Sequence, residues 1–294
     1  GIFLDAESES EAEAETKAGA EAEAGAETDA EAEGGGERGG ERGARTLQAL
    51  WQHERQQHRR PLTPIAQPHG GAELRVSDVV ALREAVADPS IGLIRLAAGV
   101  FDLAGEPLRV RRSVWLAGAG AGVEELAAIA GGQAAGQEEG AVLRSTNCCA
   151  VIWEADGGMS GLVIRRGGER SGHTSSAVHV LAGAPAIDQC AVTSSCGCGV
   201  RLSGEGGSGA VVSRCAISGC GGSGVVAEGG SKATIQDNDI YGNADAGVEI
   251  VEGADPAVRK NRIHDGKGSG VGVVGRGTKG TIENNNIHGN ASAG

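Results

Sequence analysis

The sequence predicts an all-β fold in which short parallel strands stack into a solenoid, and three observations support this prediction. The C-terminal region repeats a unit whose register is marked by Asn238, Asn261 and Asn285. Each unit contains short alternating apolar segments separated by Gly, Asn and Asp, as in strands joined by tight turns. The chain is 2% aromatic and contains 52 glycines, which suits a thin core of small aliphatic layers. Because one short unit cannot bury its own apolar face, the units must stack.

The N-terminal region differs in composition from the rest of the chain. Residues 1–45 are rich in Glu, Ala and Gly, and they carry most of the formal net charge of -13. Since this segment has no apolar stripe to bury, we expect a disordered acidic tail, with a charged lure for a basic partner as the alternative. Residues 46–72 are mixed and broken by proline, which indicates a linker. The solenoid is expected over residues 73–294.

A short helix is expected just before the first strands. Ser77 can serve as its N-cap. Val79, Leu82 and Val86 then follow the spacing of one apolar helix face, and Pro89 lies just past its end. Such a helix would cover the open end of the solenoid, where unpaired strand edges invite aggregation.

The strands are expected to follow this helix. Residues 91–120 contain four alternating strand-like segments, residues 121–140 interrupt the pattern as a loop, and the pattern resumes at Ala141. Aligning the repeats gives a prediction of about nine coils, of which the first are degenerate. Because the first residue is Gly rather than Met and the last lies within a repeat, we expect a fragment at both ends, with the solenoid incomplete at its C-terminus.

Composition narrows the expected partners. The residues after the tail form no basic stripe, so nucleic acid is not expected to bind. No apolar run approaches the roughly 18 residues of a membrane span, so no membrane partner is expected. The seven cysteines lie in one central block without the spacing of a zinc site. Their odd number favours reduced thiols in the cytoplasm or nucleus, and no cofactor is expected.

Strand alternation predicts three rows of outward side chains along the coils. The first row is Ile152, His179, Arg201, Val226, Glu249 and Gly272. The second is Gln189, Arg214, Asp237, Lys260 and Asn284, and the third is Ala191, Ala216, Asp239, Arg262 and Asn286. The first row has no paired carboxylates, so a two-carboxylate glycosidase is not expected. The charged members form a candidate binding face, although opposite charges on successive coils are also ordinary cross-strand partners, an interpretation that we favour over catalysis.

A different row is predicted to be a buried structural ladder. It contains Asn238, Asn261 and Asn285, and Cys190 and Cys215 fall on the same register. A stacked amide can donate to one neighbouring coil and accept from the other, and Asn tolerates a left-handed turn. The cysteines are therefore expected to be stacked interior residues rather than metal ligands.

Three aromatic residues share a further register: Tyr241, His264 and His288. Two stacked histidines can bind a metal, but we see no carboxylate row beside them. The row is therefore expected to line a turn, and no metal is expected.

The repeats NDIYGNADAGVEIVEGADPAVRKNRIHDGKGSGV (238–271) resemble those of right-handed parallel β-helix families with the pectate-lyase type of fold. They are most similar to the β-helix domain of F-box ubiquitin-ligase adaptor proteins, over about residues 185–294, with a weaker match from residue 91. In that family the β-helix is implied to hold the degradation target, while a separate F-box contacts the ligase core. No F-box is found in this sequence, and residues 47–60 are only faintly like the end of one.

Two functions remain open from the sequence. The favoured one is a non-catalytic β-helix scaffold that recognises a protein partner, with a role in protein ubiquitination implied by the resemblance. The alternative is a carbohydrate-active enzyme (polysaccharide lyase, hydrolase or epimerase), because one fold can host both functions. Asp237, Asp239 and Arg262 are the nearest approach to a catalytic set. We expect no turnover of pectate, alginate or a glucan.

Overall fold

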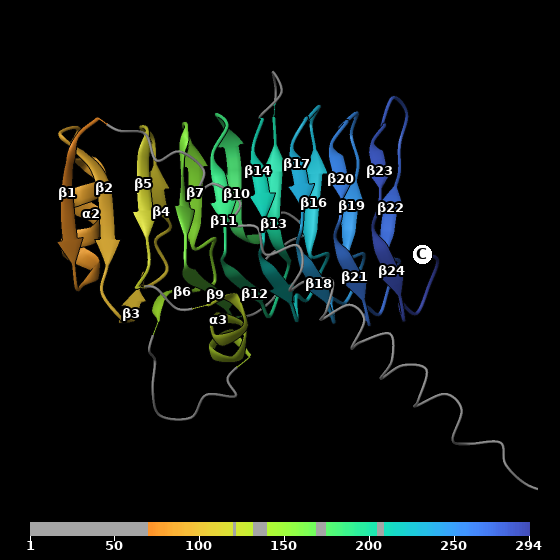
Figure 1. The fold of residues 1–294 in the computed structure, drawn as a ribbon, viewed down its shortest axis with the longest axis horizontal. Helices are drawn as coiled ribbons and strands as arrows, with labels where there is room; N and C mark the ends of the chain where they lie inside the picture. Colours follow the sequence, from red (N-terminus) through yellow and green to blue (C-terminus); the bar gives the residue numbers. More distant parts are fainter. Residues whose placement is uncertain (1–69, 120–121, 132–139, 169–174, 205–208) are drawn as a thin grey trace, which may run out of the picture. The chain divides into compact units, whose positions relative to one another are not determined.

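The computed structural model of the chain describes residues 70–119, 122–131, 140–168, 175–204 and 209–294. The predicted tail and nearly all of the predicted linker lie outside the described residues. The described part is a solenoid built from three parallel sheets, called sheets A, B and C below (Figure 1). The predicted fold class is therefore confirmed. The three sheets contain nine, eight and seven strands, which corresponds to about eight coils rather than nine.

Each coil contributes in turn one strand to sheet A, one to sheet B and one to sheet C. Sheet A contains β1 (Ala72–Val76), β2 (Ile91–Leu96), β5 (Val114–Ala117), β8 (Gly157–Ser160), β11 (Ala186–Asp188), β14 (Val211–Ser213), β17 (Thr234–Gln236), β20 (Ala257–Arg259) and β23 (Thr281–Glu283). Sheet B contains β3 (Gly99–Asp102), β6 (Ala141–Thr146), β9 (Leu162–Gly167), β12 (Ala191–Ser194), β15 (Ala216–Ser218), β18 (Asp239–Tyr241), β21 (Arg262–His264) and β24 (Asn286–His288). Sheet C contains β4 (Leu108–Val110), β7 (Val151–Glu154), β10 (Ser176–Ala182), β13 (Cys198–Ser203), β16 (Val225–Glu228), β19 (Val248–Ile250) and β22 (Val271–Val273).

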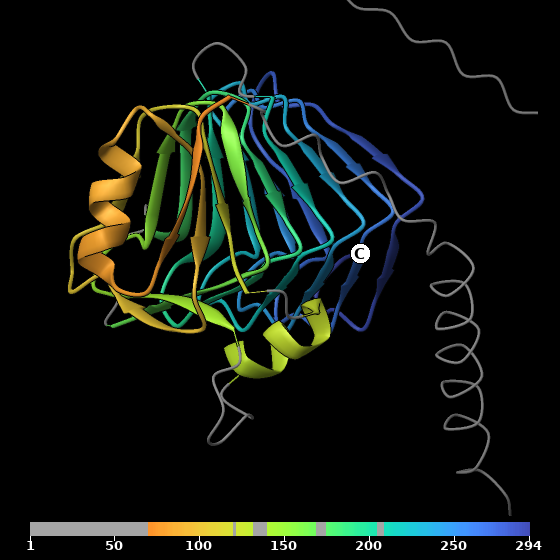
Figure 2. The ribbon, with the colours of Figure 1, turned by 60° about the vertical axis from the view of Figure 1, so that its left-hand side comes forward.

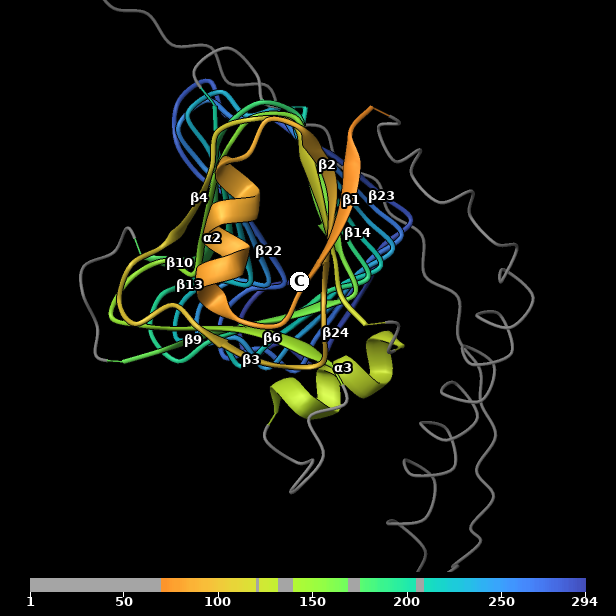
Figure 3. The same ribbon diagram turned by 90° about the vertical axis from the view of Figure 1, so that its left-hand side faces the viewer.

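The three sheets surround the interior of the solenoid in the end-on view (Figure 3), and the core is made of buried aliphatic side chains from these sheets. Most strands point one or two aliphatic side chains inward, so equal positions of successive coils stack into columns. In sheet B, for example, Val192, Ile217, Ile240 and Ile263 are register neighbours and are fully buried. These columns form a thin core of aliphatic layers, which explains why so few aromatic residues are needed.

The predicted capping helix is present as α2 (Val79–Ala87), beside β4 at the N-terminal end of the solenoid (Figures 2 and 3). Its N-cap is Asp78 rather than Ser77, because the Asp78 carboxylate accepts the backbone N–H groups of Val80 and Ala81 at 3.0 and 2.9 Å. A carboxylate at this position also interacts favourably with the helix dipole. Leu82 is fully buried and covers the end of the core.

The prediction of a loop over residues 121–140 is wrong in part, because α3 (Val123–Ala130) lies outside sheet B (Figure 3). Glu124 and Glu125 occupy its first turn, where acidic side chains are favourable. Leu126 is fully buried against Val142 and Val163 of sheet B. The helix is stabilised by this outward apolar patch of the sheet, a contact that the local sequence does not reveal. Neither described helix is long and apolar enough to span a membrane.

The turn between sheets A and B explains the asparagine register. Asn238 and Asn261 are buried, and each amide bridges two coils: the Asn238 side chain and backbone N–H groups both donate to Asn261 Oδ1 at 3.0 Å. Asn261 donates in the same way to Asn285 Oδ1, at 3.0 and 2.8 Å. Cys190 and Cys215 occupy the same position in the preceding coils and are also buried.

The left-handed residue of this turn precedes the asparagine. The expected second outward row has positive φ throughout: Gln189 (49°), Arg214 (53°), Asp237 (56°), Lys260 (55°) and Asn284 (54°). These residues therefore lie in a turn and not on a strand. The left-handed conformation was expected at the ladder asparagines, but it occurs at the residue before each of them. A single left-handed residue is enough to redirect the chain sharply between two sheets.

A second ladder lies in the turn between sheets B and C, and it was missed in the sequence. Asn243 is buried, and its Oδ1 accepts the backbone N–H of Cys220 at 3.0 Å. Gly266 occupies this position one repeat later, and two repeats later Asn290 Oδ1 accepts the Gly266 N–H at 3.0 Å. Gly247, just before β19, is required for packing, because a Cβ there would clash with Cγ2 of Ile263.

Candidate functional site

The first predicted outward row lies on the outside of sheet C. His179 pairs in register with Ile152 on one side and Arg201 on the other, and Val226 pairs with Glu249. The row therefore follows the sheet over successive coils. It brings His179 and Arg201 together, whereas Val226 separates Arg201 from Glu249.

Two further side chains, Ser203 and Glu228, join His179 and Arg201 of this row in a polar network. We call these four residues the sheet C network. Ser203 Oγ donates to Glu228 Oε1 at 2.6 Å and lies 2.9 Å from His179 Nε2. Arg201 forms an ion pair with Glu228. Since the Ser203 hydroxyl proton points to Glu228, the hydroxyl oxygen accepts from His179, and the neutral imidazole carries its proton on Nε2.

The sheet C network is shielded from water although it faces outward. The Arg201 and Glu228 side chains are 10% and 17% exposed. Burial lowers the pKa of His179, the Arg201 charge lowers it further, and Glu228 opposes both effects only in part. His179 is therefore neutral at pH 7. A neutral imidazole, a hydroxyl and a carboxylate joined by hydrogen bonds can pass a proton between them, which is the requirement for general acid–base chemistry.

Ser203 and Glu228 were missed in the sequence because only the first outward position of each strand was considered. They are register partners on β13 and β16, two residues after Arg201 and Val226. Continuing the alternation by one more step would have found them. Glu249, further along the sheet, accepts a hydrogen bond from Ser223 at 2.8 Å.

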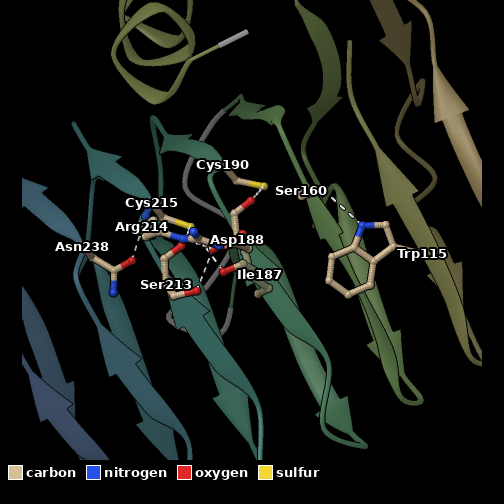
Figure 4. A network of polar contacts seen from close by, with 9 residues as sticks. All are labelled: Trp115, Ser160, Ile187, Asp188, Cys190, Ser213, Arg214, Cys215 and Asn238. Atoms are coloured by element: carbon tan, nitrogen blue, oxygen red, sulfur yellow. Dashed lines mark hydrogen bonds and ion pairs between the residues drawn. The ribbon is translucent and has the colours of Figure 1, made fainter. Parts of the chain in front are cut away.

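A second polar cluster lies on sheet A (Figure 4). Asp188 is buried, and its Oδ1 accepts from Ser213 Oγ and from Arg214 Nε, each at 2.8 Å. Arg214 reaches it from the left-handed turn, with a second guanidinium nitrogen on Asp188 Oδ2. The carboxylate is thus held by two side chains, which makes Arg214 a structural partner. Asp237 and Lys260 occupy the same turn position in later coils, and the Lys260 side chain is exposed.

A third cluster surrounds His264 on sheet B. Its Nδ1 lies 2.7 Å from Asp265 Oδ2, and its Nε2 lies 3.1 Å from Asp239 Oδ1. The ring stacks between Tyr241 and His288 at centroid distances of 5.3 and 5.1 Å. Burial alone would lower the pKa of His264, but the hydrogen bonds to the two carboxylates outweigh it and raise the pKa.

This third cluster corrects the expectation that no carboxylates flank the stacked histidines. Asp239 also lies 3.8 Å from Arg262 Nη1, so the third outward row brings that expected pair together. Among the described residues, no group of three or more His, Cys, Asp or Glu side chains is arranged to hold a metal ion. The carboxylates instead hold the imidazole from both of its nitrogens.

Three of the cysteines, Cys198, Cys215 and Cys220, are unsuited to chemistry. All seven thiols are free, and five of them are buried. Burial raises the pKa of Cys198 and raises that of Cys220 to about 12. Burial, reinforced by Cys190, also raises the pKa of Cys215 well above its ordinary value. Because the thiolate is the reactive form, these thiols are poor nucleophiles and poor metal ligands at neutral pH.

Comparison with known proteins agrees with the observed fold. Residues 153–294 match the model of a family described as right handed beta helix region. No curated protein matches the sequence. One similar solved structure is the A-module of mannuronan C-5 epimerase AlgE6 from Azotobacter vinelandii, at 18% identity and a TM-score of 0.45, with 67% of this chain and 55% of that chain covered. Another is the AlgE4 A-module from the same organism, at 18% identity and a TM-score of 0.39, with 74% and 75% covered.

The chain thus spans 55% of the AlgE6 module, and a likeness at these identities concerns the fold alone. The comparisons give no support to the resemblance to F-box adaptors or to a role in ubiquitination. They do support the resemblance to right-handed β-helix proteins. The family model that matches residues 153–294 and the three parallel sheets give the fold, a right-handed parallel β-helix.

Proposed function

We propose that the protein is carbohydrate-active, that it binds a polysaccharide along the outside of sheet C, and that the sheet C network is its acid–base centre. The observation that carries this proposal is the continuous, shielded hydrogen-bond chain from His179 through Ser203 to Glu228. The two other polar clusters have different compositions, because Asp188 is contacted by a hydroxyl and a guanidinium, and His264 contacts its two carboxylates directly.

The geometry of sheet C suits a hydroxyl-rich polymer. Strands stack at about 4.8 Å, so side chains at equal positions form an extended row. This row offers both donors and acceptors, and sugar hydroxyls can pair with either kind of group. A polymer lying across the strands would meet the sheet C network together with Glu249.

The roles of the residues follow from their charges. Glu228 is placed to exchange a proton with a bound hydroxyl or ring carbon, and Ser203 is placed to connect it to the neutral imidazole of His179. Arg201 is a positioning residue that holds the carboxylate in place. Such acid–base pairs contribute roughly 10²–10⁴-fold to enzymatic rates. The proposal therefore favours the enzyme over the non-catalytic scaffold expected from the sequence.

The test uses the full chain with alginate, polygalacturonate and a neutral β-glucan, followed by NMR for bond cleavage, double-bond formation or epimerisation. We expect one polymer to be turned over, and Glu228→Gln and His179→Gln to slow this at least 100-fold. Glu73→Gln is the matched control, since Glu73 pairs with Arg95 on sheet A instead. Thermal melting establishes that each variant is folded. Turnover that survives Glu228→Gln, or no binding to any of the polymers, contradicts the proposal.

A specific observation also favours a second candidate, a protein-binding scaffold. Leu181 on β10 is 39% exposed, and Val273 and Val274 are 46% and 61% exposed near the same sheet. Exposed aliphatic side chains suit a protein partner better than a sugar. A scaffold would lose its partner with Leu181→Asp and keep it with Glu228→Gln, which is the opposite of the pattern expected for the carbohydrate-active protein.

A further inference from the structure

Beyond the sheet C network, a separate pocket of about 620 Å³ opens at the N-terminal end of the solenoid, between α2 and the segment around β4. Its walls include Val86, Pro107 and Leu108. Four of the lining residues are arginines: Arg83, Arg109, Arg111 and Arg112. The acid among the lining residues is Glu106. None of the residues of the sheet C network lines this pocket.

Two of the four arginines are fixed by backbone carbonyl groups. Arg112 donates to the carbonyls of Ala85, Val86 and Ile91 at 2.7, 2.8 and 2.6 Å, which satisfies the C-terminal end of α2. Arg83 donates to the carbonyl of Glu106 at 2.8 Å and to two others at 3.3 Å. Carbonyl groups are neutral, so these hydrogen bonds fix the two arginines without cancelling their charge. Glu106 also lies 4.0 Å from Arg83, and Asp88 interacts electrostatically with Arg112.

The other two arginines share one carboxylate. Arg109 Nη1 and Arg111 Nε lie 3.2 and 2.9 Å from the two oxygens of Glu154. The arginine side chains are 46% and 68% exposed, whereas Glu154 is 26% exposed. Each contact occupies one nitrogen of a guanidinium that has five N–H donors, so donors remain for a ligand. Four arginines face three acids here, Glu106, Glu154 and Asp88, which leaves an excess of positive charge on a chain whose net charge is -13.

We infer that this pocket binds a small organic anion, with a carboxylate or phosphate group on an apolar or ring-shaped body. The anionic group would lie against Arg109 and Arg111, because a guanidinium fork matches both oxyanions in two-point contact. The body would lie against Val86, Pro107 and Leu108. The volume falls in the range of small-molecule sites, roughly 300–1,000 Å³, and far exceeds what a bare inorganic ion needs.

The experiment uses four probes with the full chain, measured by isothermal titration calorimetry at low ionic strength. Phenyl phosphate and benzoate carry both a body and a charge, inorganic phosphate carries only the charge, and benzyl alcohol carries only the body. We expect phenyl phosphate or benzoate to bind at least tenfold more tightly than the two partial probes. Tighter binding of phenyl phosphate would indicate a phosphate-bearing ligand, and tighter binding of benzoate a carboxylate-bearing one. Binding should weaken as salt is added, since part of the attraction is between exposed charges.

Substitutions locate the site and change affinity in opposite directions. Arg109→Gln and Arg111→Gln should each weaken binding of the tighter probe at least fivefold. Glu154→Gln should strengthen it, because it releases both guanidinium groups, and a misfolded variant would not bind more tightly. Arg144→Gln is the matched control: Arg144 is also 46% exposed and pairs with an acid, but it lies on sheet B. No binding of either complete probe, or the same affinity in Arg111→Gln as in Arg144→Gln, overturns the inference.

Discussion

Two rows of polar side chains lie on successive stretches of the solenoid, and they differ in where their hydrogen bonds end. In the turn between sheets A and B, the Asn238, Asn261 and Asn285 amides donate to and accept from one another inside the protein. On the outside of sheet C, the hydrogen bonds run from His179 through Ser203 to Glu228, at the surface. The ladder therefore joins neighbouring coils, whereas the sheet C network would, in the proposed function, present its groups to a ligand.

The comparison shows that repetition in the sequence is a sign of structure more than of function. The ladder asparagines recur because every coil has the same turn to satisfy, and a buried polar group without a partner is costly. The residues of the sheet C network occur once each, on neighbouring coils. The predictions below test this difference, beginning with the largest expected effect.

Asn261→Leu should lower the free energy of unfolding by about 3 kcal/mol or more. The substitution removes the acceptor of two Asn238 N–H groups and the side-chain donor to Ile235 and Asn285. Each unsatisfied buried group costs about 1–3 kcal/mol. Urea unfolding followed by circular dichroism measures the loss. A change below 1 kcal/mol would show that the ladder does not stabilise the stack.

The ion pair of the sheet C network should behave differently. Arg201→Leu or Glu228→Leu alone should cost about 2–3 kcal/mol, because each leaves a poorly exposed charge without its partner. The double substitution should cost less than either single one, since apolar pairs often replace shielded ion pairs without loss. The same unfolding experiment, arranged as a double-mutant cycle, measures this coupling. If the double substitution costs the sum of the two single losses, Arg201 and Glu228 do not stabilise each other.

Asn284→Ala should cost about 1 kcal/mol, and its neighbour Asn286→Ala no more than about 0.5 kcal/mol. Asn284 has a φ of 54°, a left-handed conformation that costs an alanine about 1–2 kcal/mol. Asn286 lies exposed on β24, where substitutions are usually tolerated. Asn284→Gly supplies the control, because glycine adopts positive φ freely and should keep the stability close to that of the unchanged chain. Equal losses for alanine and glycine would contradict this explanation.

The smallest expected effects concern pH, and they have opposite signs in His264 and His179. The folded pKa of His264 is raised above 6.5, so its stabilising contribution is fully present below pH 6.5 and is lost as the pH rises through the folded value. The folded pKa of His179 is lowered, so its contribution is present above pH 6.5 and is lost as the pH falls through the folded value. His264→Gln should therefore cost more stability at pH 5.5 than at pH 8, and His179→Gln the reverse. Thermal melting of both variants and the unchanged chain at the two pH values checks these signs, and the same sign for both would refute the assignment.

The sequence by itself determined the features that repeat. The spacing of Asn238, Asn261 and Asn285 and the alternating apolar residues were enough to predict stacked parallel coils, because every coil must bury the same face in the same way. The first outward row of sheet C followed from alternation as well. The capping helix followed from its apolar spacing and the proline after it, although its N-cap was placed one residue early.

Only the tertiary structure decided the features that depend on a neighbour from another coil. The helix α3 exists because Leu126 meets an apolar patch on sheet B, and a local sequence cannot show what lies beneath it. Glu228 becomes a candidate catalytic residue only beside Ser203 and His179, which lie 25 and 49 positions earlier in the chain. A repeated turn is fixed by local backbone geometry, whereas a site that occurs once is fixed by register between coils, and register is a property of the folded stack.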